Sequence, residues 1–174
     1  MKKILAIAAA MAISTAAFGA NVKANKLGVN FAYDSGTSNI GVLWHVADTV
    51  ALRPFVGFKN KAIDQGTTTT TMTFGLDLPI YLANFNALDL YVAPGISYNS
   101  EKTAPAIGSA TTATTLDLKA MLGLQVKLAD QVHLFGELGL SYSSYNDGTP
   151  APGTTKSTTI ATGRTAVGAI FYFN

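Results

Sequence analysis

The sequence of 174 residues contains no cysteine and few charged residues. Without cysteine the chain can form neither a disulfide framework nor a cysteine metal site. Only 13% of the residues are charged and the mean hydropathy is +0.27, which is unusually apolar for a soluble protein. Beyond the N-terminus no run of 18 apolar residues occurs, so a membrane-spanning helix is excluded there. High apolarity without long apolar runs favours β-strands that each have one apolar face.

Residues 1–20 are predicted to be a cleaved secretory signal peptide. Lys2 and Lys3 precede the apolar run ILAIAAAMAI and the small-residue stretch STAAFGA, which is the order of regions in such signals. Residues 21–174 are then expected to form one domain. Removal of the two lysines takes the formal net charge from +2 to 0. The sequence pI of 8.8 therefore gives no argument for a nucleic-acid partner.

The strongest pattern is the alternation of apolar and polar residues between Leu116 and Tyr145. Side chains two residues apart lie on the same face of a strand, so this stretch predicts strands with one apolar face. Only residues 129–131 interrupt the alternation. We therefore expect two long strands joined by a tight turn, with Lys127 opposite His133.

The same alternation recurs along the chain and predicts eight antiparallel strands. The expected strands are 27–33, 40–46, 50–58, 67–82, 88–98, 116–128, 132–145 and 157–173. Short junctions at 47–49, 83–87 and 129–131 alternate with longer connections at 34–39, 60–66, 100–110 and 146–156. An even number of strands, with short turns in the periplasm and longer loops outside, is typical of an up-and-down transmembrane β-barrel. The predicted fold class is thus an all-β, eight-stranded antiparallel transmembrane barrel.

Glycines and aromatic residues indicate which face of the sheet meets the membrane. Each predicted strand has one glycine on its polar face: Gly28, Gly41, Gly57, Gly75, Gly95, Gly123, Gly139 and Gly168. Glycine weakens a solvated strand, whereas the narrow lumen of an eight-stranded barrel needs small residues beside long ones. A soluble barrel of lipocalin type shares the alternation but does not explain these glycines, so the polar face is predicted to be the interior.

The apolar face carries aromatic residues near the strand ends, as expected for the two girdles of a membrane barrel. The predicted girdle residues are Tyr33, Trp44, Phe58, Phe74, Tyr98 and Tyr142. The two levels are separated by about 20 to 25 Å of tilted strand. Pro54, Pro79 and Pro94 fall inside predicted strands. Because proline has no backbone N–H to donate, we expect bulges or kinks at these three positions.

Charged residues of both signs lie on the predicted inner face. The expected lumen network consists of Arg53, Asp77, Asp89, Asp117, Lys119, Lys127, Glu137 and Arg164. Charges in a narrow lumen need partners because desolvation of an unpaired charge costs several kcal/mol, and we expect Arg53 to pair with Asp77. The network either plugs the barrel or lines a narrow ion path, and conductance in planar bilayers distinguishes the two.

No catalytic, cofactor or metal site is expected from the sequence. The two histidines, His45 and His133, lie on the predicted inner face beside the short turns. The sequence contains no Gly-x-Ser-x-Gly motif, phosphate-binding loop or metal-ligand cluster. The protein is therefore predicted not to be an enzyme.

The final strand resembles the C-terminal strand by which outer-membrane barrels are recognised for assembly. Gly168, Phe171 and Phe173 match that pattern, whereas Ala166 and Asn174 depart from it. With the signal peptide and the eight strands, the mature chain resembles the small outer-membrane barrels of the OmpX and OmpA-transmembrane type.

This resemblance implies an outer-membrane location, contact with membrane lipid and lipopolysaccharide, and insertion by the barrel-assembly machinery. It also implies a monomer whose role is structural or exercised at the cell surface. A conduit for small or hydrophobic solutes, as in OmpW-like barrels, is the alternative. A lipid-modifying barrel enzyme is a remote third possibility, because such enzymes need a histidine at the outer-leaflet end, and both histidines lie at the other end.

Overall fold

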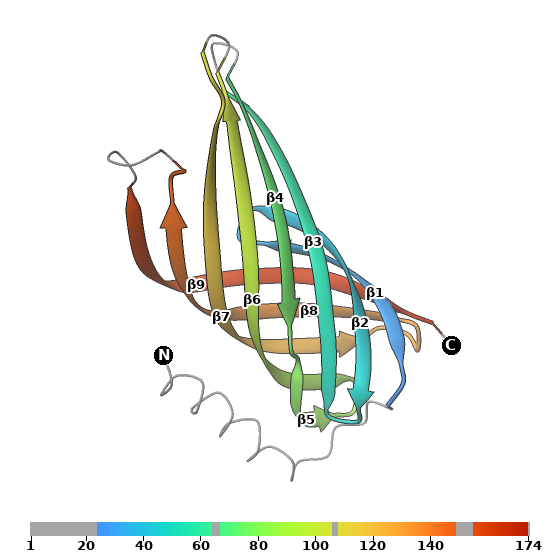
Figure 1. Ribbon diagram of the computed structural model, residues 1–174. Coiled ribbons are helices and arrows are strands. Elements are labelled where there is room, and N and C mark those ends of the chain that lie inside the picture. Colours follow the sequence, from blue (N-terminus) through green and yellow to red (C-terminus); the bar gives the residue numbers. More distant parts are fainter. Residues whose placement is uncertain (1–23, 64–66, 106–107, 149–154, 174) are drawn as a thin grey trace.

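The computed structural model describes residues 24–63, 67–105, 108–148 and 155–173, which form a closed β-barrel (Figure 1). The predicted signal peptide at residues 1–20 lies outside the described residues. Within the described ranges there is no helix long and apolar enough to cross a membrane.

Nine strands form a single antiparallel sheet. They are β1 (Leu27–Asp34), β2 (Thr37–Ala47), β3 (Val50–Ile63), β4 (Thr67–Asp77), β5 (Ile80–Phe85), β6 (Leu88–Ala104), β7 (Thr111–Lys127), β8 (Val132–Asn146) and β9 (Lys156–Tyr172). β4 and β5 are two halves of one predicted strand, and both pair with β3 and β6. Every other strand pairs with its neighbours in sequence, and β9 pairs with β1. The prediction of an eight-stranded up-and-down barrel is therefore confirmed.

The strands close the barrel with a stagger. Starting at Tyr33, directly opposed residues on successive strands are Ser38, Phe58, Met72, Ser100, Thr114, Asn146 and finally Lys156 of β9. Tyr33 itself, however, pairs with Val167 of β9. A sheet that closes at a shifted position on the same strand must have strands tilted from the barrel axis. A β-bulge at Gly163, which has a φ of +77°, adds to this shift in β9.

Two of the three prolines coincide with the interruption between β4 and β5. The strand stops at Leu78-Pro79, and the register shifts again between Tyr81 and Ala83. On one side, Pro94 of β6 pairs with β7. On its other side it faces the interruption between β4 and β5, where the Pro94 carbonyl accepts a hydrogen bond from the Leu78 N–H at 2.9 Å. The missing N–H of Pro94 thus falls where the ladder is already interrupted. Pro54 of β3 lies in an unshifted ladder with β4, whereas its ladder with β2 is interrupted between the pairs Gly41–Phe55 and Trp44–Leu52. Pro54 is thus accommodated by a local interruption without a change of register.

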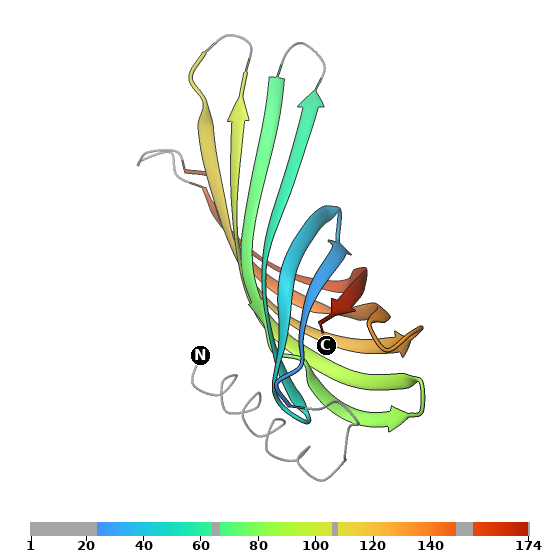
Figure 2. The ribbon, with the colours of Figure 1, turned by 90° about the vertical axis from the view of Figure 1, so that its right-hand side faces the viewer.

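The strands extend further than the sequence predicts at the end of the barrel opposite the short turns. The predicted loop 34–39 is a two-residue turn, Ser35-Gly36, with φ of 47° and 94°, which is the geometry of a tight hairpin. The predicted loops at 60–66 and 100–110 are shorter, because β3 continues to Ile63, β6 to Ala104, and β7 starts at Thr111. As a result, the β3–β4 and β6–β7 hairpins rise well beyond the β1–β2 hairpin (Figures 1 and 2).

The hairpin of β7 and β8 has the predicted register. Lys127 pairs with His133 and Gly123 pairs with Glu137. Along β7, buried and exposed residues alternate from Leu116 to Val126. The apolar residues of this stretch point outward, with Leu122 54% exposed. The outer surface of the barrel is thus apolar, and the polar face is its interior.

Candidate functional site

The barrel lumen brings together most of the buried polar and charged side chains of the described residues. Glycines on the inner face make room for its large side chains. A Cβ on Gly75 would lie 2.2 Å from the Phe55 ring, and one on Gly123 would lie 2.2 Å from the Tyr91 ring. These separations are far below van der Waals contact. At both positions the glycine therefore leaves space for an aromatic ring from the neighbouring strand.

Arg53 of β3 is the centre of the charged network. Its guanidinium lies 2.9 Å from the Asp77 carboxylate and 2.6 Å from the Glu137 carboxylate. The Tyr91 hydroxyl donates a second hydrogen bond to Glu137 at 2.7 Å. The guanidinium also stacks over the Phe135 ring, with 5.1 Å to the centroid. All of these groups are buried, so each charge is desolvated and compensated by its partners.

Lys119 continues the network towards the loop end, which is the end carrying the Ser35-Gly36 turn. Its ammonium group lies 3.0 Å from Asp77 and 3.3 Å from Asp34. Arg164 makes two parallel hydrogen bonds of 3.0 Å to the two oxygens of Asp34 and lies 3.6 Å from Asp117. Seven charged side chains thus form one continuous chain of contacts: Glu137, Arg53, Asp77, Lys119, Asp34, Arg164 and Asp117.

Asp34 holds two cations and was not among the predicted network residues. Its position at the end of an apolar alternation favoured a turn residue, but β1 extends to Asp34 and directs it inward. Asp34 continues the inner-face series of Gly28, Asn30 and Ala32, in which each residue follows the last by two positions. This spacing would have identified Asp34 as an inward-facing residue.

Two predicted network residues lie outside this chain of contacts, and their assignment is corrected here. Lys127 is 46% exposed at the last residue of β7, where its ammonium group pairs with Asp130 of the following turn at 2.6 Å. The hydrogen bond from Lys127 lowers the pKa of the Asp130 carboxyl. Asp89 is buried near a turn and accepts a hydrogen bond from Asn84, five residues before it. Both residues are too close to the turns to reach Arg53 or Lys119.

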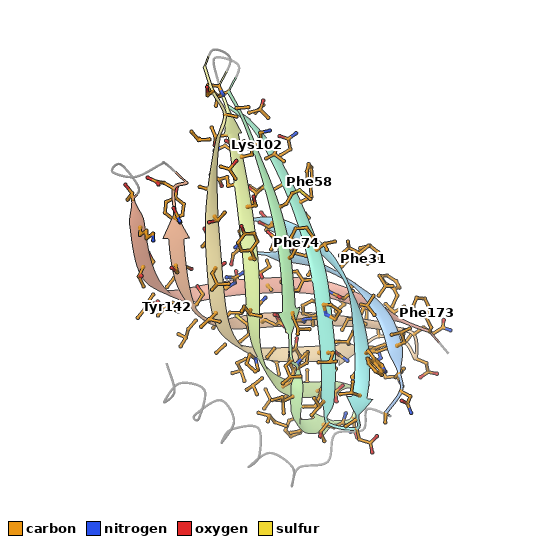
Figure 3. All side chains as sticks on the ribbon, in the orientation of Figure 1. Phe31, Phe58, Phe74, Lys102, Tyr142 and Phe173 are labelled. Carbon is orange, nitrogen blue, oxygen red and sulfur yellow. The ribbon has the colours of Figure 1, made fainter. Side chains whose placement is uncertain are left out.

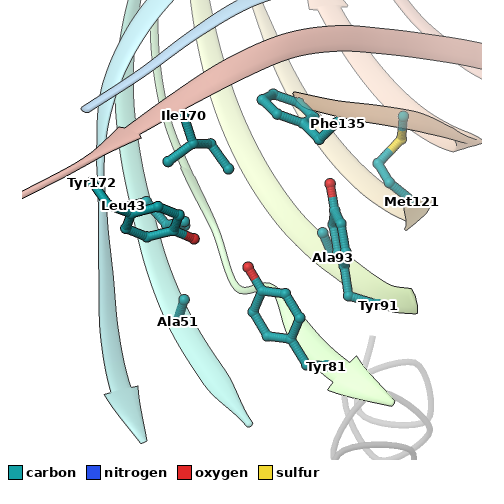
Figure 4. Packing of buried hydrophobic residues seen from close by; sticks show 9 residues of the cluster. All are labelled: Leu43, Ala51, Tyr81, Tyr91, Ala93, Met121, Phe135, Ile170 and Tyr172. Atoms are coloured by element: carbon teal, nitrogen blue, oxygen red, sulfur yellow. The ribbon is translucent and has the colours of Figure 1, made fainter. Parts of the chain in front are cut away.

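An aromatic and aliphatic cluster fills the lumen towards the short turns, which we call the turn end. Leu43, Ala51, Tyr81, Tyr91, Ala93, Met121, Phe135, Ile170 and Tyr172 form this cluster (Figure 4). The Tyr81 and Tyr91 rings lie 5.4 Å apart between centroids. The Tyr81 hydroxyl donates to Gln125 at 3.1 Å, and the Gln125 amide contacts the Tyr172 hydroxyl at 3.3 Å. Sequence reasoning missed these tyrosines, because it assigned aromatic side chains to the lipid face.

Both histidines are buried at the turn end of the lumen, as the sequence predicts. The His45 Nε2 lies 3.0 Å from the Tyr172 hydroxyl, and the His133 Nδ1 lies 2.8 Å from the Gln125 amide nitrogen. Across the described ranges, no three His, Cys, Asp or Glu residues are grouped to hold a metal ion. Neither imidazole contacts a serine hydroxyl or a carboxylate among the described hydrogen bonds. The arrangement offers packing and hydrogen bonding rather than a nucleophile with a base.

The side chains leave little free space around the charged network. The cavity there has a volume of about 10 Å³ and is lined by Asn30, Asn39, Arg53, Asp77 and Glu137, among others. A cavity with a volume of at least about 10 to 15 Å³ is needed to hold one water molecule. The cavity beside the network thus has room for about one water molecule.

The predicted girdle residues and Gly168 and Phe171 of the predicted assembly signal lie on strands, and Phe173 directly follows the end of β9. The side chains of Tyr33, Trp44, Phe58, Phe74, Tyr98, Tyr142, Phe171 and Phe173 are exposed on the outer surface. Figure 3 shows Phe31, Phe58, Phe74, Tyr142 and Phe173 projecting from the barrel wall. Gly168 lies on the inner face of β9, where a Cβ would lie 2.6 Å from the Phe135 ring. Its absence of a side chain accommodates Phe135.

No family model matches the sequence, and no curated protein matches it. Solved structures do match. A major outer membrane protein from Thermus thermophilus superposes with a TM-score of 0.57 at 15% identity, over 85% of this chain and 98% of that chain. The attachment invasion locus protein Ail of Yersinia pestis, in complex with the heparin analogue sucrose octasulfate, gives a TM-score of 0.48 at 11% identity, over 85% and 94%. The chain therefore has the fold of the eight-stranded outer-membrane β-barrel proteins.

Proposed function

We propose that this chain is an integral outer-membrane protein whose lumen is closed by its own side chains and whose role is structural or exercised at its surface. The observation that carries the proposal is the chain of seven charged side chains across the lumen, with about 10 Å³ of free space beside it. Below it, the aromatic cluster fills the turn end. A protein with such an interior offers neither a pore nor a substrate pocket there.

The apolar outer surface and the fold support the outer-membrane location. Large apolar side chains such as Leu122, Leu138 and Val167 are more than half exposed, and only a lipid surround makes such a surface favourable. In this setting the partners are outer-membrane lipid, lipopolysaccharide and, during biogenesis, the barrel-assembly machinery reading Gly168, Phe171 and Phe173. The proposal includes a monomeric barrel without catalysis.

Conductance in planar lipid bilayers tests the closed lumen. The folded wild-type protein is expected to show no conductance comparable to a porin, because ions would have to displace the Arg53 and Lys119 contacts. A variant with both residues replaced by serine removes two long side chains and is expected to conduct more than the wild type. Porin-like conductance of the wild-type protein would contradict the closed lumen and favour the alternative function, a conduit for small solutes.

Membrane fractionation with gel mobility before and after boiling tests the location. The chain is expected to fractionate with the outer membrane and to change mobility on boiling, because a closed barrel resists unfolding in detergent until heated. A chain found in the soluble periplasmic fraction would contradict the proposal.

A further inference from the structure

Five polar side chains at the turn end of the lumen form one hydrogen-bond network. They are His45 of β2, Tyr81 of β5, Gln125 of β7, His133 of β8 and Tyr172 of β9. All five are buried, and none is more than 6% exposed. The hydroxyls of the two tyrosines point into the lumen (Figure 4). Gln125 lies at the centre of the network, because its amide contacts three of the other four side chains.

The direction of each hydrogen bond follows from the Gln125 amide. Its Oε1 atom accepts from the Tyr81 hydroxyl at 3.1 Å, and its Nε2 atom provides two N–H donors. One N–H donates to Nδ1 of His133 at 2.8 Å, and the other donates to the Tyr172 hydroxyl oxygen at 3.3 Å. The Tyr172 hydrogen then donates to Nε2 of His45 at 3.0 Å. Both histidines therefore act as acceptors, which only the neutral imidazole can do.

This arrangement also assigns the single ring hydrogen of each histidine. A neutral imidazole that accepts at one nitrogen carries its hydrogen on the other. His45 therefore carries the hydrogen on Nδ1, and His133 carries it on Nε2. These are the two ring nitrogens that have no hydrogen-bond partner among the described residues. Neither ring can thus take up a proton without changing a hydrogen bond that it already makes.

Protonation of His133 is incompatible with the arrangement in the structure. Its Nδ1 atom would become a donor facing the Gln125 N–H at 2.8 Å, and two donors cannot share a hydrogen bond. The contact is restored when the amide turns over, which exchanges Oε1 and Nε2. Oε1 then accepts from His133 and Tyr172, so His45 can donate to the Tyr172 oxygen. The same rotation removes the Oε1 acceptor of the Tyr81 hydroxyl.

The charges around the two rings make the protonated form still less favourable. They are Lys26 before β1, Asp89 of β6, Lys127 of β7 and Asp130 of the following turn. The Lys26 ammonium lies 4.4 Å from the centroid of the Tyr172 ring, and it repels a positive charge on either histidine. Asp89 and Asp130 already have partners of their own. Neither histidine contacts a carboxylate among the described hydrogen bonds.

We propose that this network is a proton-sensitive switch that holds the turn end of the lumen closed while both histidines are neutral. Proton uptake turns the Gln125 amide over, places positive charge beside Lys26 and weakens the packing of the strands at the turn end. This inference rests on the closed lumen proposed above and adds the condition under which its turn end loosens.

Nitrogen-15 NMR of the folded wild-type barrel tests the network. The chain has two histidines, so one single variant of each assigns the signals. At neutral pH, His45 is expected to carry its hydrogen on Nδ1 and His133 on Nε2. Acidification is expected to protonate both rings and to shift the signals of the Gln125 side-chain amide. The opposite tautomer at either ring would overturn the assigned arrangement, and an amide signal that does not respond to acid would overturn the switch.

Urea unfolding in lipid vesicles, at about pH 7 and about pH 5, measures the effect on the fold. An exposed histidine gains its proton at about pH 6.5. Each histidine that stays neutral in the folded barrel therefore lowers the equilibrium constant for folding roughly 25-fold over this interval. His45→Gln with His133→Asn offers amide oxygens in place of the two accepting nitrogens and cannot be protonated, so this double variant is expected to lose that part of the pH dependence. Its other titrating groups are those of the wild type, so it is the matched control.

Gln125→Glu tests the role of the amide. A carboxylate only accepts, so it binds His133 and Tyr172 as donors without turning over. The roughly 25-fold loss contributed by His133 is then expected to disappear. Equal pH dependence of the wild type, the double histidine variant and Gln125→Glu would overturn the switch. Porin-like conductance of the wild type at neutral pH contradicts the closed lumen, whereas a closed lumen without this pH dependence contradicts the switch alone.

Discussion

Replacement of Arg53 by methionine removes the charge at the centre of the lumen network while keeping most of the side-chain volume. Two buried carboxylates, Asp77 and Glu137, then lose their contacts of 2.9 Å and 2.6 Å to the guanidinium. Each keeps one partner: Asp77 keeps Lys119 at 3.0 Å and Glu137 keeps the Tyr91 hydroxyl at 2.7 Å. The variant therefore leaves under-compensated charges rather than fully isolated ones.

The expected loss of stability follows from these remaining contacts. Removal of one partner of a buried ion pair typically costs about 3–5 kcal/mol, because the other charge stays desolvated. Since both carboxylates retain a hydrogen-bond donor, we expect about 3 kcal/mol for Arg53→Met, at the low end of that range. The double variant with Glu137→Gln removes one of the uncompensated charges and is expected to regain part of the loss.

Urea unfolding of the barrel in lipid vesicles measures this effect through tryptophan fluorescence. Trp44 is the single tryptophan of the chain, and it lies on the outer surface, so its emission changes when the barrel leaves the lipid. Lys127→Met is the control, because its pair with Asp130 is exposed and should contribute little to the free energy of unfolding. An Arg53→Met variant as stable as this control would refute the view that the network is buried and tightly coupled.

Two further substitutions test the packing of the lumen and the assignment of the outer face. Gly123→Ala forces a Cβ to within 2.2 Å of the Tyr91 ring and is expected to cost about 1–3 kcal/mol in the same urea assay. A Cβ on Gly136 meets nothing within 4 Å, so Gly136→Ala is the control. Equal stability of the two alanine variants would contradict the packing of the lumen. Leu122→Lys puts a charge on the lipid face and is expected to cost about 2–4 kcal/mol, measured as a lower folded fraction by mobility on unboiled gels. Thr112→Lys, at the exposed start of β7, should fold like the wild type, and equal behaviour of the two lysine variants would show that the faces are wrongly assigned.

The alternation of apolar and polar residues predicts the strands and their register in the part of the barrel between the two girdles. In β7 and β8 most outward positions are apolar and most inward ones are small or polar, with Met121 and Phe135 as inward exceptions, so the sequence alone predicts the register that pairs Lys127 with His133. The same reasoning identifies the opposed pair of Arg53 and Asp77, which face each other in the β3–β4 ladder. Periodicity succeeds here because the lipid face requires apolar side chains while most inward positions of this hairpin are polar or small.

Above the girdle nearest the loops, most residues on both faces of the strands are polar, so the alternation no longer predicts where a strand begins or ends. β7 starts at Thr111 rather than at the predicted Leu116, because threonine on both faces gives no alternation, although its branched side chain favours strands. The inward tyrosines Tyr81 and Tyr91 were missed for a related reason. An aromatic side chain suits either the lipid face or a packed lumen, and for Tyr91 the opposed Gly123 leaves the space that the ring needs inside.

The height of the β1–β2 hairpin explains where the charged network ends. This hairpin turns at Ser35-Gly36, so the ring of strands is complete only up to Asp34, which lies opposite Ala166 of β9. At that level and just below it the seven charges of the network are largely buried and paired, because the closed wall excludes water. Above it, Lys59 and Glu101 face the inner side of an open wall and are exposed. Lengthening the hairpin should therefore bury Lys59, which forms none of the described ion pairs, and burial of an unpaired charge is unfavourable.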